Sequence, residues 1–313
     1  MSLTLAQGNE YSVTEMQRAV IDRLVKDSDV LARLGFVTVL GNSLTYDTIT
    51  TDASAAFYAV GDTWTESTVD VTQATAALKV LGGDADVDNF LLKTRSNKID
   101  LQGTVLSNKV KVVQYKFLDG FYYGTEFDAN GFSGLHQLMT STTYNTVQAA
   151  TADVNGAAAT IANMRKAKDL ITGWKPDLML MSKTMRRLLS TYLDSVGSAF
   201  PRGVDRFGNQ VEMFDNCPIS VDDHILNTES THTDGTFLTH SADDQTTIFF
   251  LSFDEMACCG IHSGDGVQVE EIGNLETKDA RRWRVKWYVS MMLQDLRSCS
   301  KYCGIISSSA VTA

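Results

Sequence analysis

The chain has 313 residues, a length that suggests two lobes or one domain with a large extension. Hydrophobic residues make up 43% and charged residues 21%, and this globular composition excludes disorder for the bulk of the chain. The 38 Asp and Glu outnumber the 27 Lys and Arg, so the formal net charge is −11. Proteins that coat nucleic acid usually carry a basic surplus. The acidic balance argues against that role, but not against a protein that encloses nucleic acid without binding it tightly.

Neither a membrane segment nor a secretory signal is expected. No segment reaches the roughly 18–20 uninterrupted apolar residues that span a bilayer. Met1–Asn9 lacks both a basic region and an apolar core, so we expect no signal peptide there. The cysteines number five, and an odd count without a secretory signal indicates reduced thiols in a cytosolic setting.

The first periodic segment is Thr14–Leu34, which we predict to be a helix. Thr14 is a candidate N-cap and Gly35 a candidate stop. Apolar residues recur near helical spacing in this segment, at Met16, Val20, Leu24, Leu31 and Leu34.

From residue 36 to residue 88 the composition changes to Thr, Ala, Val and Ser with few charges. Alternation at Ser43–Ile49 predicts a strand, and we expect further short strands at Ala55–Val60 and Val69–Leu81. The segment has too few large apolar residues to form a core of its own. We therefore interpret it as an extended β arm that lies on another part of the molecule or on another molecule. The alternative is an ordinary antiparallel sheet packed on the main body.

Residues 88–120 carry the clearest helical pattern of the chain. A helix of about 22 residues would be about 33 Å long at the usual rise per residue. We expect Gly120 and Gly124 to bracket its end. Its apolar stripe, at positions i, i+4, i+7 and i+11, consists of Leu106, Val110, Val113 and Phe117.

The remainder of the chain alternates strands and helices, a pattern typical of an α/β or α+β fold. We predict a helix at Ala157–Ile171, a strand at Asp177–Met181, a helix capped by Ser182 and running through Leu193, and strands at Thr246–Phe253, Gly266–Ile272 and Arg281–Leu293.

The last strand has two chemically different faces, because side chains alternate along a strand. Trp283, Val285 and Trp287 occupy one face, and we expect them to pack under the long helix, against Leu106, Val113 and Phe117. The other face carries Arg282, Arg284 and Lys286, and we expect it to point outward from the sheet.

Five short patterns accompany this order of elements: Gly41–Tyr46, Asp88–Phe90, Phe117–Gly120, Phe132–Leu135 and Val267–Glu271. Together they resemble the major capsid proteins of tailed bacteriophages, which have the Hong Kong 97-like capsid fold. The resemblance implies an α+β fold with an N-terminal arm, an extended β loop, a peripheral domain with a long spine helix and a β-hairpin, and an α/β axial domain.

The resemblance covers nearly the whole chain and implies a division of it into four parts. The N-terminal arm would be residues 1–35, the extended β loop 36–88, the peripheral domain 89–149 and 252–293, and the axial domain 150–251 and 294–313.

The function implied by the resemblance is that of a shell subunit without enzymatic activity or cofactors. Many copies would assemble as hexamers and pentamers into the icosahedral shell of a tailed bacteriophage, enclosing double-stranded DNA without sequence-specific binding. The N-terminal arm implied by the resemblance begins almost at Met1, so we expect a separate scaffolding protein rather than a cleaved leader. A portal protein and a decoration protein are further implied partners, and a membrane is not. The protein would reside in the virion, after assembly in the host cytoplasm.

Five residues are our candidates for contacts between subunits. A shell protein must make large interfaces with several neighbours, and Tyr46 and Trp64 are the aromatic candidates in the arm. The basic strand face is expected to take acidic partners from a neighbouring copy, because a DNA-binding surface requires a wider basic field. The candidates are Tyr46, Trp64, Arg282, Arg284 and Lys286.

Two alternatives to the phage capsid remain open. One is an encapsulin-like compartment shell of the same fold. The other, from a different class, is a metal-dependent hydrolase that uses the region from Asp222 to His240, although a solvated turn at Asp222–His224 is the simpler interpretation.

The cysteines are weak candidates for a metal site. Cys299 and Cys303 could lie one turn apart on a helix as a zinc half-site, but a closed zinc site needs two more ligands. The favoured alternative is that they are buried small apolar groups in a strand or terminal segment. Cys258 and Cys259 are adjacent and would face opposite sides of a strand. We therefore expect no catalytic, cofactor-binding or metal-binding residues.

Overall fold

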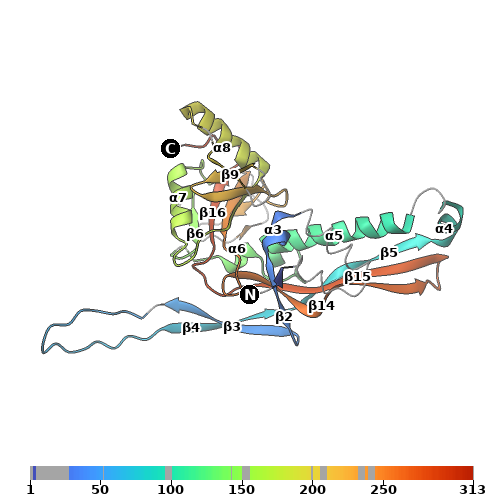
Figure 1. The fold of residues 1–313 in the computed structure, drawn as a ribbon, viewed down its shortest axis with the longest axis horizontal. Helices are drawn as coiled ribbons and strands as arrows, with labels where there is room; N and C mark the ends of the chain where they lie inside the picture. The colour runs from blue at the N-terminus through green and yellow to red at the C-terminus, as the bar shows by residue number, and fades with distance from the viewer. Residues whose placement is uncertain are drawn as a thin grey trace.

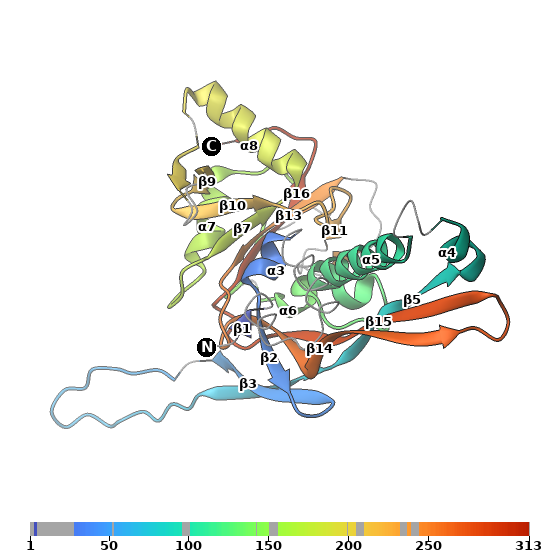
Figure 2. The same cartoon turned by 45° about the vertical axis from the view of Figure 1, so that its right-hand side comes forward.

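Two large sheets, one long helix and a projecting hairpin make up the fold (Figure 1). The upper sheet and its helices form a body that stands on an elongated lower layer, and the hairpin extends from that layer in the opposite direction to the long helix (Figures 1 and 2). The computed structural model describes residues 3–4, 28–51, 53–95, 101–141, 143–149, 156–198, 200–204, 210–231, 237–238 and 244–312.

The upper sheet has seven strands and is mixed. Helices α7 (Ile161–Asp169) and α8 (Lys183–Val196) cover one of its faces, and Ser182 caps α8 as predicted. In sheet order the strands are β6 (Thr146–Gln148), β16 (Ser300–Ile306), β13 (Gln245–Leu251), β7 (Leu178–Met181), β10 (Cys217–Val221), β9 (Gln210–Phe214) and β8 (Arg202–Val204).

The lower layer is a five-stranded sheet covered by helix α5 (Leu101–Tyr123). Its centre is a long antiparallel hairpin, and its far end carries α4 (Asn89–Arg95). Within the part of the chain that the structure describes, no helix is both long enough and apolar enough to cross a bilayer. In sheet order the strands are β1 (Leu3–Thr4), β2 (Gly35–Val39), β14 (Cys258–Asn274), β15 (Ala280–Leu293) and β5 (Lys79–Asp88).

Helix α5 is the element that joins the two sheets. Its Phe117 ring lies 4.9 Å from the Trp287 ring of the lower sheet, and its Tyr122 ring lies 5.5 Å from the Phe249 ring of the upper sheet. One continuous apolar core therefore runs from sheet to sheet through the helix. The prediction that the aromatic face of the last strand packs under the long helix is confirmed, and all four residues of the predicted stripe are buried.

The helix predicted over residues 88–120 ends between Gly120 and Gly124 as expected, but its first part is a separate helix. It is divided into α4 and α5, with residues 96–100 outside the described part of the chain, and α5 continues past Gly120 to Tyr123. Gly120 lies inside the helix, and its missing side chain makes room for the Phe132 ring. A Cβ at this position would lie 3.3 Å from that ring. The true stop is Gly124, whose φ of +60° disfavours any other residue.

The projecting arm is a hairpin of β3 (Ser43–Thr51) and β4 (Asp70–Ala77). The predicted strand at Ser43–Ile49 is confirmed. The strand predicted at Val69–Leu81 contains the whole of β4 and the start of β5, whereas Ala55–Val60 is not a strand. Because residues 53–59 have no strand opposite them to pair with, propensity alone does not order them as β structure.

Both ends of the segment predicted as the arm, residues 36–88, are strands of the lower sheet. The arm that projects is therefore shorter than predicted. Strand β2 pairs in parallel with β14, and β5 pairs with β15 from Lys79 to Asp88. Phe36 of β2 is buried and lies 5.5 Å from the Trp287 ring. The projecting segment therefore lies between β2 and β5, and the flanking strands belong to the body.

Two further predictions concern the N-terminal helix and the pair Cys299 and Cys303. The helix predicted at Thr14–Leu34 is described only as α3 (Asp29–Arg33), capped by Ser28, while Thr14 and residues 14–27 lie outside the described residues. Cys303 lies on the buried strand β16 and Cys299 immediately precedes it, so the helical half-site is wrong and the favoured alternative of buried thiols in a strand is confirmed.

Replacing Trp287 with Ala should lower the free energy of unfolding by about 3–5 kcal/mol, because it opens a cavity under α5. Urea denaturation of the unassembled chain measures this value. Val80→Ala on the neighbouring strand β5 is the control, because Val80 is 77% exposed and its truncation should be near neutral. Equal losses from the two variants would contradict the proposed core.

Candidate assembly surfaces

The tip of the arm exposes large apolar side chains in an ordered loop. Phe57 and Val60 are fully exposed, and Trp64 is 79% exposed. The Trp64 ring stacks on Tyr58 at 4.5 Å and 25°, and the Tyr58 hydroxyl accepts a hydrogen bond from the Thr65 amide at 3.1 Å. These contacts fix the shape of the tip before any partner binds, although they bury little apolar surface. An exposed apolar group of this kind is typical of an interaction site.

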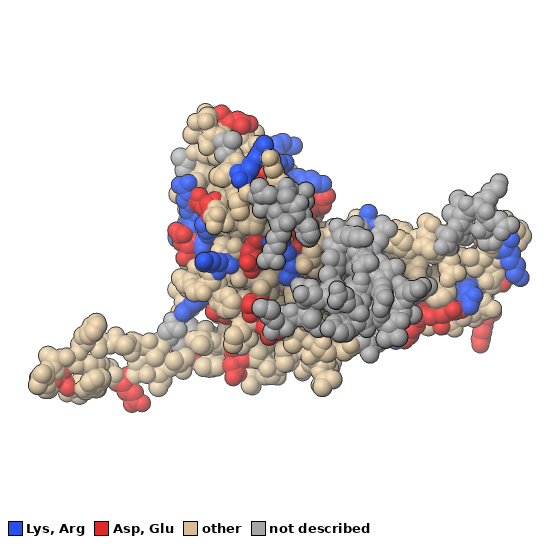
Figure 3. Space-filling view, viewed as in Figure 1, with Lys and Arg blue, Asp and Glu red and all other residues tan. Residues whose placement is uncertain are grey.

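The whole arm is acidic. Between Arg33 and Lys79 the sequence contains no Lys or Arg, and Figure 3 shows the arm without blue side chains. A partner of this surface must therefore offer apolar area together with neutral or cationic groups, since further carboxylates would be repelled. The acidic residues are Asp47, Asp52, Asp62, Glu66 and Asp70.

The two aromatic candidates predicted from the sequence lie in different environments. Trp64 is at the exposed tip, whereas Tyr46 is half-buried at the base of the arm, against the chain's own Cys259 and Met292 cluster. Burial raises the pKa of the Tyr46 hydroxyl. Tyr46 therefore anchors the arm to the body, and a contact of Tyr46 with another copy stays a prediction.

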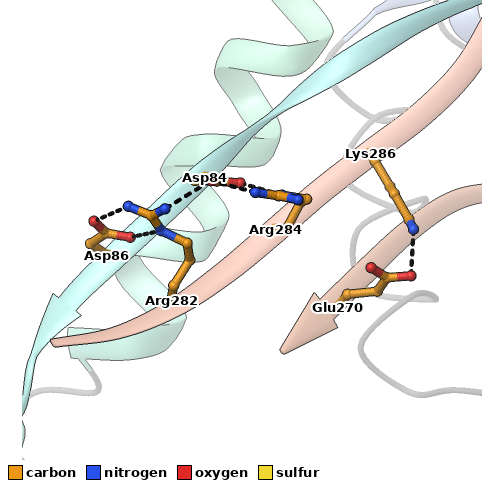
Figure 4. A network of polar contacts seen from close by, with 6 residues as sticks. All are labelled: Asp84, Asp86, Glu270, Arg282, Arg284 and Lys286. Atoms are coloured by element: carbon orange, nitrogen blue, oxygen red, sulfur yellow. Dashed lines mark hydrogen bonds and ion pairs between the residues drawn. The ribbon is translucent and has the colours of Figure 1, made fainter. Parts of the chain in front are cut away.

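The three basic candidates lie together on the outer face of the lower sheet, in a network that we call the charge ladder (Figure 4). Arg282 binds Asp86 through two hydrogen bonds of 2.6 and 2.8 Å, and Arg284 binds Asp84 through two of 2.6 and 2.9 Å. Asp84 also lies 3.4 Å from Arg282, so it bridges both guanidinium groups. On the other flank, the Lys286 ammonium lies 2.5 Å from the Glu270 carboxylate.

The charge ladder changes our expectation for these residues. We expected an outward basic face whose acidic partners come from a neighbouring copy, but β5 and β14 of the same chain supply the acids. Strand register places Arg284 opposite both Asp84 and Glu270. The three cations of this face are matched by three anions, which are Asp84, Asp86 and Glu270. The face is outward and electroneutral, and its contact with another copy stays a prediction.

Hydrogen bonds from Arg284 lower the pKa of Asp84, and those from Arg282 lower the pKa of Asp86. The stabilisation by both carboxylates is therefore complete above the ordinary Asp pKa, and it is lost as the pH falls through the lowered values of the folded chain. The Asp84-x-Asp86 spacing matches Arg282-x-Arg284, and this signal in the sequence could have predicted the pairing.

The hydrolase candidate Asp222–His224 borders a cavity of about 520 Å³ between α3, α5 and β10. Each side chain there is paired. His224 Nδ1 lies 2.7 Å from Asp119, Tyr122 donates to Asp222 at 2.8 Å, and the Lys183 ammonium lies 2.5 Å from Asp223.

Burial alone lowers the pKa of His224, but the hydrogen bond to Asp119 and the charge of Asp222 outweigh it, so the pKa is raised. His232 and His240 lie outside the described residues. Among the residues that the structure does describe, no three His, Cys, Asp or Glu side chains are grouped to hold a metal ion.

The five cysteines are free and buried. Cys258 lies in the core under α5, and Cys259 lies in the cluster at the base of the arm, so the prediction that they face opposite sides is confirmed. Burial raises the pKa of Cys303 to about 11 and that of Cys259 to about 12. These thiols are protonated at neutral pH and pack as small apolar groups.

Solved structures of shell proteins are similar to the chain over most of its length. The holo-SrpI encapsulin complex from Synechococcus elongatus PCC 7942 has a TM-score of 0.67 at 13% identity, covering 90% of this chain and 88% of that chain. The capsid of a native GTA particle has a TM-score of 0.62 at 12% identity, covering 88% of this chain and 89% of that chain. The procapsid of satellite phage P4 has a TM-score of 0.55 at 13% identity, covering 94% of this chain and 92% of that chain.

No protein-family model and no curated protein matches the sequence. The structural likeness, at identities this low, establishes the fold: the chain has the Hong Kong 97-like capsid fold, and the predicted α+β class is confirmed.

Reversing one charge of the ladder should lower the thermal midpoint by several degrees. Arg284→Glu places a carboxylate between Asp84 and Glu270, and like charges on adjacent strands repel. The paired swap Asp84→Arg with Arg284→Asp should recover part of the loss, because it restores one opposite pair.

Lys166→Glu on the exposed surface of α7 is the matched control for this charge reversal. Scanning calorimetry of the unassembled variants measures the midpoints. If the swap were no more stable than Arg284→Glu alone, pairing within the chain would not be the source of the stability.

Proposed function

We propose that this chain is the major capsid protein of a tailed bacteriophage, and that many copies form an icosahedral shell around double-stranded DNA. The observation that carries the proposal is the arm: an ordered, acidic hairpin whose apolar tip has no partner surface within the described part of its own chain. The fold supports the same role, because the similar structures include a native GTA capsid and the satellite phage P4 procapsid.

The arm supplies contact area that the body of a single copy does not use. A stable interface between proteins buries about 1,200–2,000 Å². A hairpin that lies across a neighbour presents both faces and its tip to that neighbour, at little entropic cost because the tip is already ordered. The exposed Trp64 and Phe57 are then candidate hot spots, since aromatic anchors dominate binding energy in many interfaces.

We propose the domain roles implied by the resemblance with one change. The lower sheet with α5 corresponds to the peripheral domain, and the upper sheet with α7 and α8 corresponds to the axial domain. The extended loop is narrowed to the segment between β2 and β5, because those two strands belong to the lower sheet.

The acidic surplus suits a container for DNA. A net charge of −11 disfavours tight binding of phosphate to the wall, so the packed DNA keeps its own counterions. In this proposal the protein resides in the virion, assembles in the host cytoplasm, and works with scaffolding, portal and decoration proteins. It performs no catalysis.

An encapsulin-like compartment is the second candidate, because the SrpI encapsulin structure has a TM-score of 0.67 with this chain. The two candidates differ in what the shell contains. Electron microscopy of particles purified from their native source, with nuclease-resistant nucleic acid and co-purifying protein measured in parallel, separates them. DNA-filled particles support the capsid, and particles filled with one cargo protein support the compartment. A small soluble oligomer would contradict both candidates and favour the hydrolase alternative.

Removing the aromatic tip should abolish assembly and leave the subunit folded. The double variant Phe57→Ala with Trp64→Ala deletes exposed surface, so its thermal midpoint should stay within about a degree of the wild type. Sedimentation velocity and negative-stain microscopy should find only small species. Thr68→Ala, an exposed change in the same loop, is the control and should form normal shells. Normal shells from the double variant would show that the tip is not an anchor.

A further inference from the structure

The described structure contains a buried group of ionisable side chains that the shell function does not require. Glu229, His136 and Lys301 are all at most 1% exposed. Glu229 precedes β11 (Ser230–Thr231), His136 lies on the short helix α6 (Leu135–Leu138), and Lys301 lies on β16. Burying ionisable groups is costly unless they are paired and hydrogen-bonded. All three make polar contacts with other elements of the fold.

Glu229 is held by donors from two elements. The Tyr123 hydroxyl, at the end of α5, donates to Oε1 at 2.5 Å, and the Thr247 hydroxyl of β13 donates to Oε2 at 2.5 Å. His136 Nε2 lies 3.7 Å from the same Oε1. The carboxylate therefore connects α5, α6 and the upper sheet.

His136 is enclosed on all sides. Its ring stacks on the Tyr123 ring at 5.3 Å and 12°, and it meets the edge of Phe249 at 5.2 Å and 85°. The Lys301 ammonium donates to the backbone carbonyl of His136 at 3.1 Å, which joins β16 directly to α6. A second positive charge on the imidazole would lie next to this ammonium in an environment without bulk water.

The charged and titratable groups that face His136 come from four elements. Tyr123 belongs to α5, Glu126 to the following turn η1 (Gly124–Glu126), Glu229 to the segment before β11, and Lys301 to β16. Burial and Lys301 disfavour the protonated ring, whereas Glu229 and Glu126 favour it. Burial is the largest effect, so the pKa of His136 is lowered from its ordinary value.

We propose that His136, Glu229 and Lys301 form a proton-sensitive latch that holds α6 and the end of α5 against the upper sheet. In the closed state His136 is neutral and packed between Tyr123 and Phe249. When α6 separates from β16, the imidazole reaches water and takes up a proton if the pH is low. Protonation therefore favours the open state, and mild acid loosens the junction between the two sheets.

The sign of this effect follows from linkage. A histidine whose pKa is lower in the closed state binds more protons when open, so the closed state loses stability as the pH falls below the ordinary histidine pKa of about 6.5. If the closed state excludes the proton, the open fraction should rise about tenfold between pH 7.5 and pH 5.5. His224 behaves in the opposite way, because its pKa is raised by Asp119 and Asp222.

The test uses the full unassembled chain, so it does not depend on shell formation. Hydrogen exchange with mass spectrometry, corrected for the intrinsic effect of pH, should show the tenfold change in peptides of α6 and β16. Peptides of α8, which contains no histidine, should not show it. His136→Gln removes the titrating group and should abolish the change. His262→Gln is the matched control, because burial also lowers the pKa of His262, which lies on β14 away from the latch, and its substitution should preserve the change in α6 and β16.

A second measurement needs no variant and so does not depend on His136→Gln folding. Exchange at the imidazole C2 position in the wild-type chain reports the titration of each histidine. We expect the midpoint of His136 below that of His224, and below about 6.5. A midpoint of His136 at or above that value, or an unchanged pH response of α6 in His136→Gln, would overturn the latch.

Discussion

The fold depends on one helix that packs against two sheets at once. Helix α5 places Phe117 on Trp287 of the lower sheet and, little more than one turn later, Tyr122 on Phe249 of the upper sheet. The buried apolar side chains of this helix belong to the same core as Trp287 of the lower sheet and Phe249 of the upper sheet. The aromatic end of α5 therefore fixes the angle between the two layers, and Gly124 and Phe132 fix where that end stops.

Periodicity in the sequence predicted the elements that form this core, because their side chains face one partner over several turns or residues. The stripe from Leu106 to Phe117 and the alternation of Trp283, Val285 and Trp287 are examples, and both are buried as predicted. The end of α5 lies between Gly120 and Gly124, as the two glycines predicted. What the sequence could not predict is the role of Gly120, which makes room for Phe132, a residue whose position depends on tertiary packing.

The surfaces were harder to predict than the core. Alternation placed Arg282, Arg284 and Lys286 on one face, but a strand does not reveal its neighbours, so Asp84 and Asp86 were not recognised as partners. The arm was recognised from its lack of large apolar residues, although its boundaries were too wide. Phe36 and Val39 are buried on β2 and Ala85 and Val87 on β5, and only pairing with β14 and β15 shows that these strands belong to the body.

The attachment of the arm also determines how the molecule bears force. Strand β5 continues the line of β4 into the sheet, and it pairs with β15 over ten residues, from Lys79 to Asp88. A pull on the tip along the arm would therefore load all of these hydrogen bonds together, in shear, rather than opening them one at a time from the edge. The cross-strand pairs of Asp84 and Asp86 with the arginines lie along the same line. Tension on the tip, such as a neighbouring copy would apply in the proposed shell, would thus be carried by strand hydrogen bonds in shear.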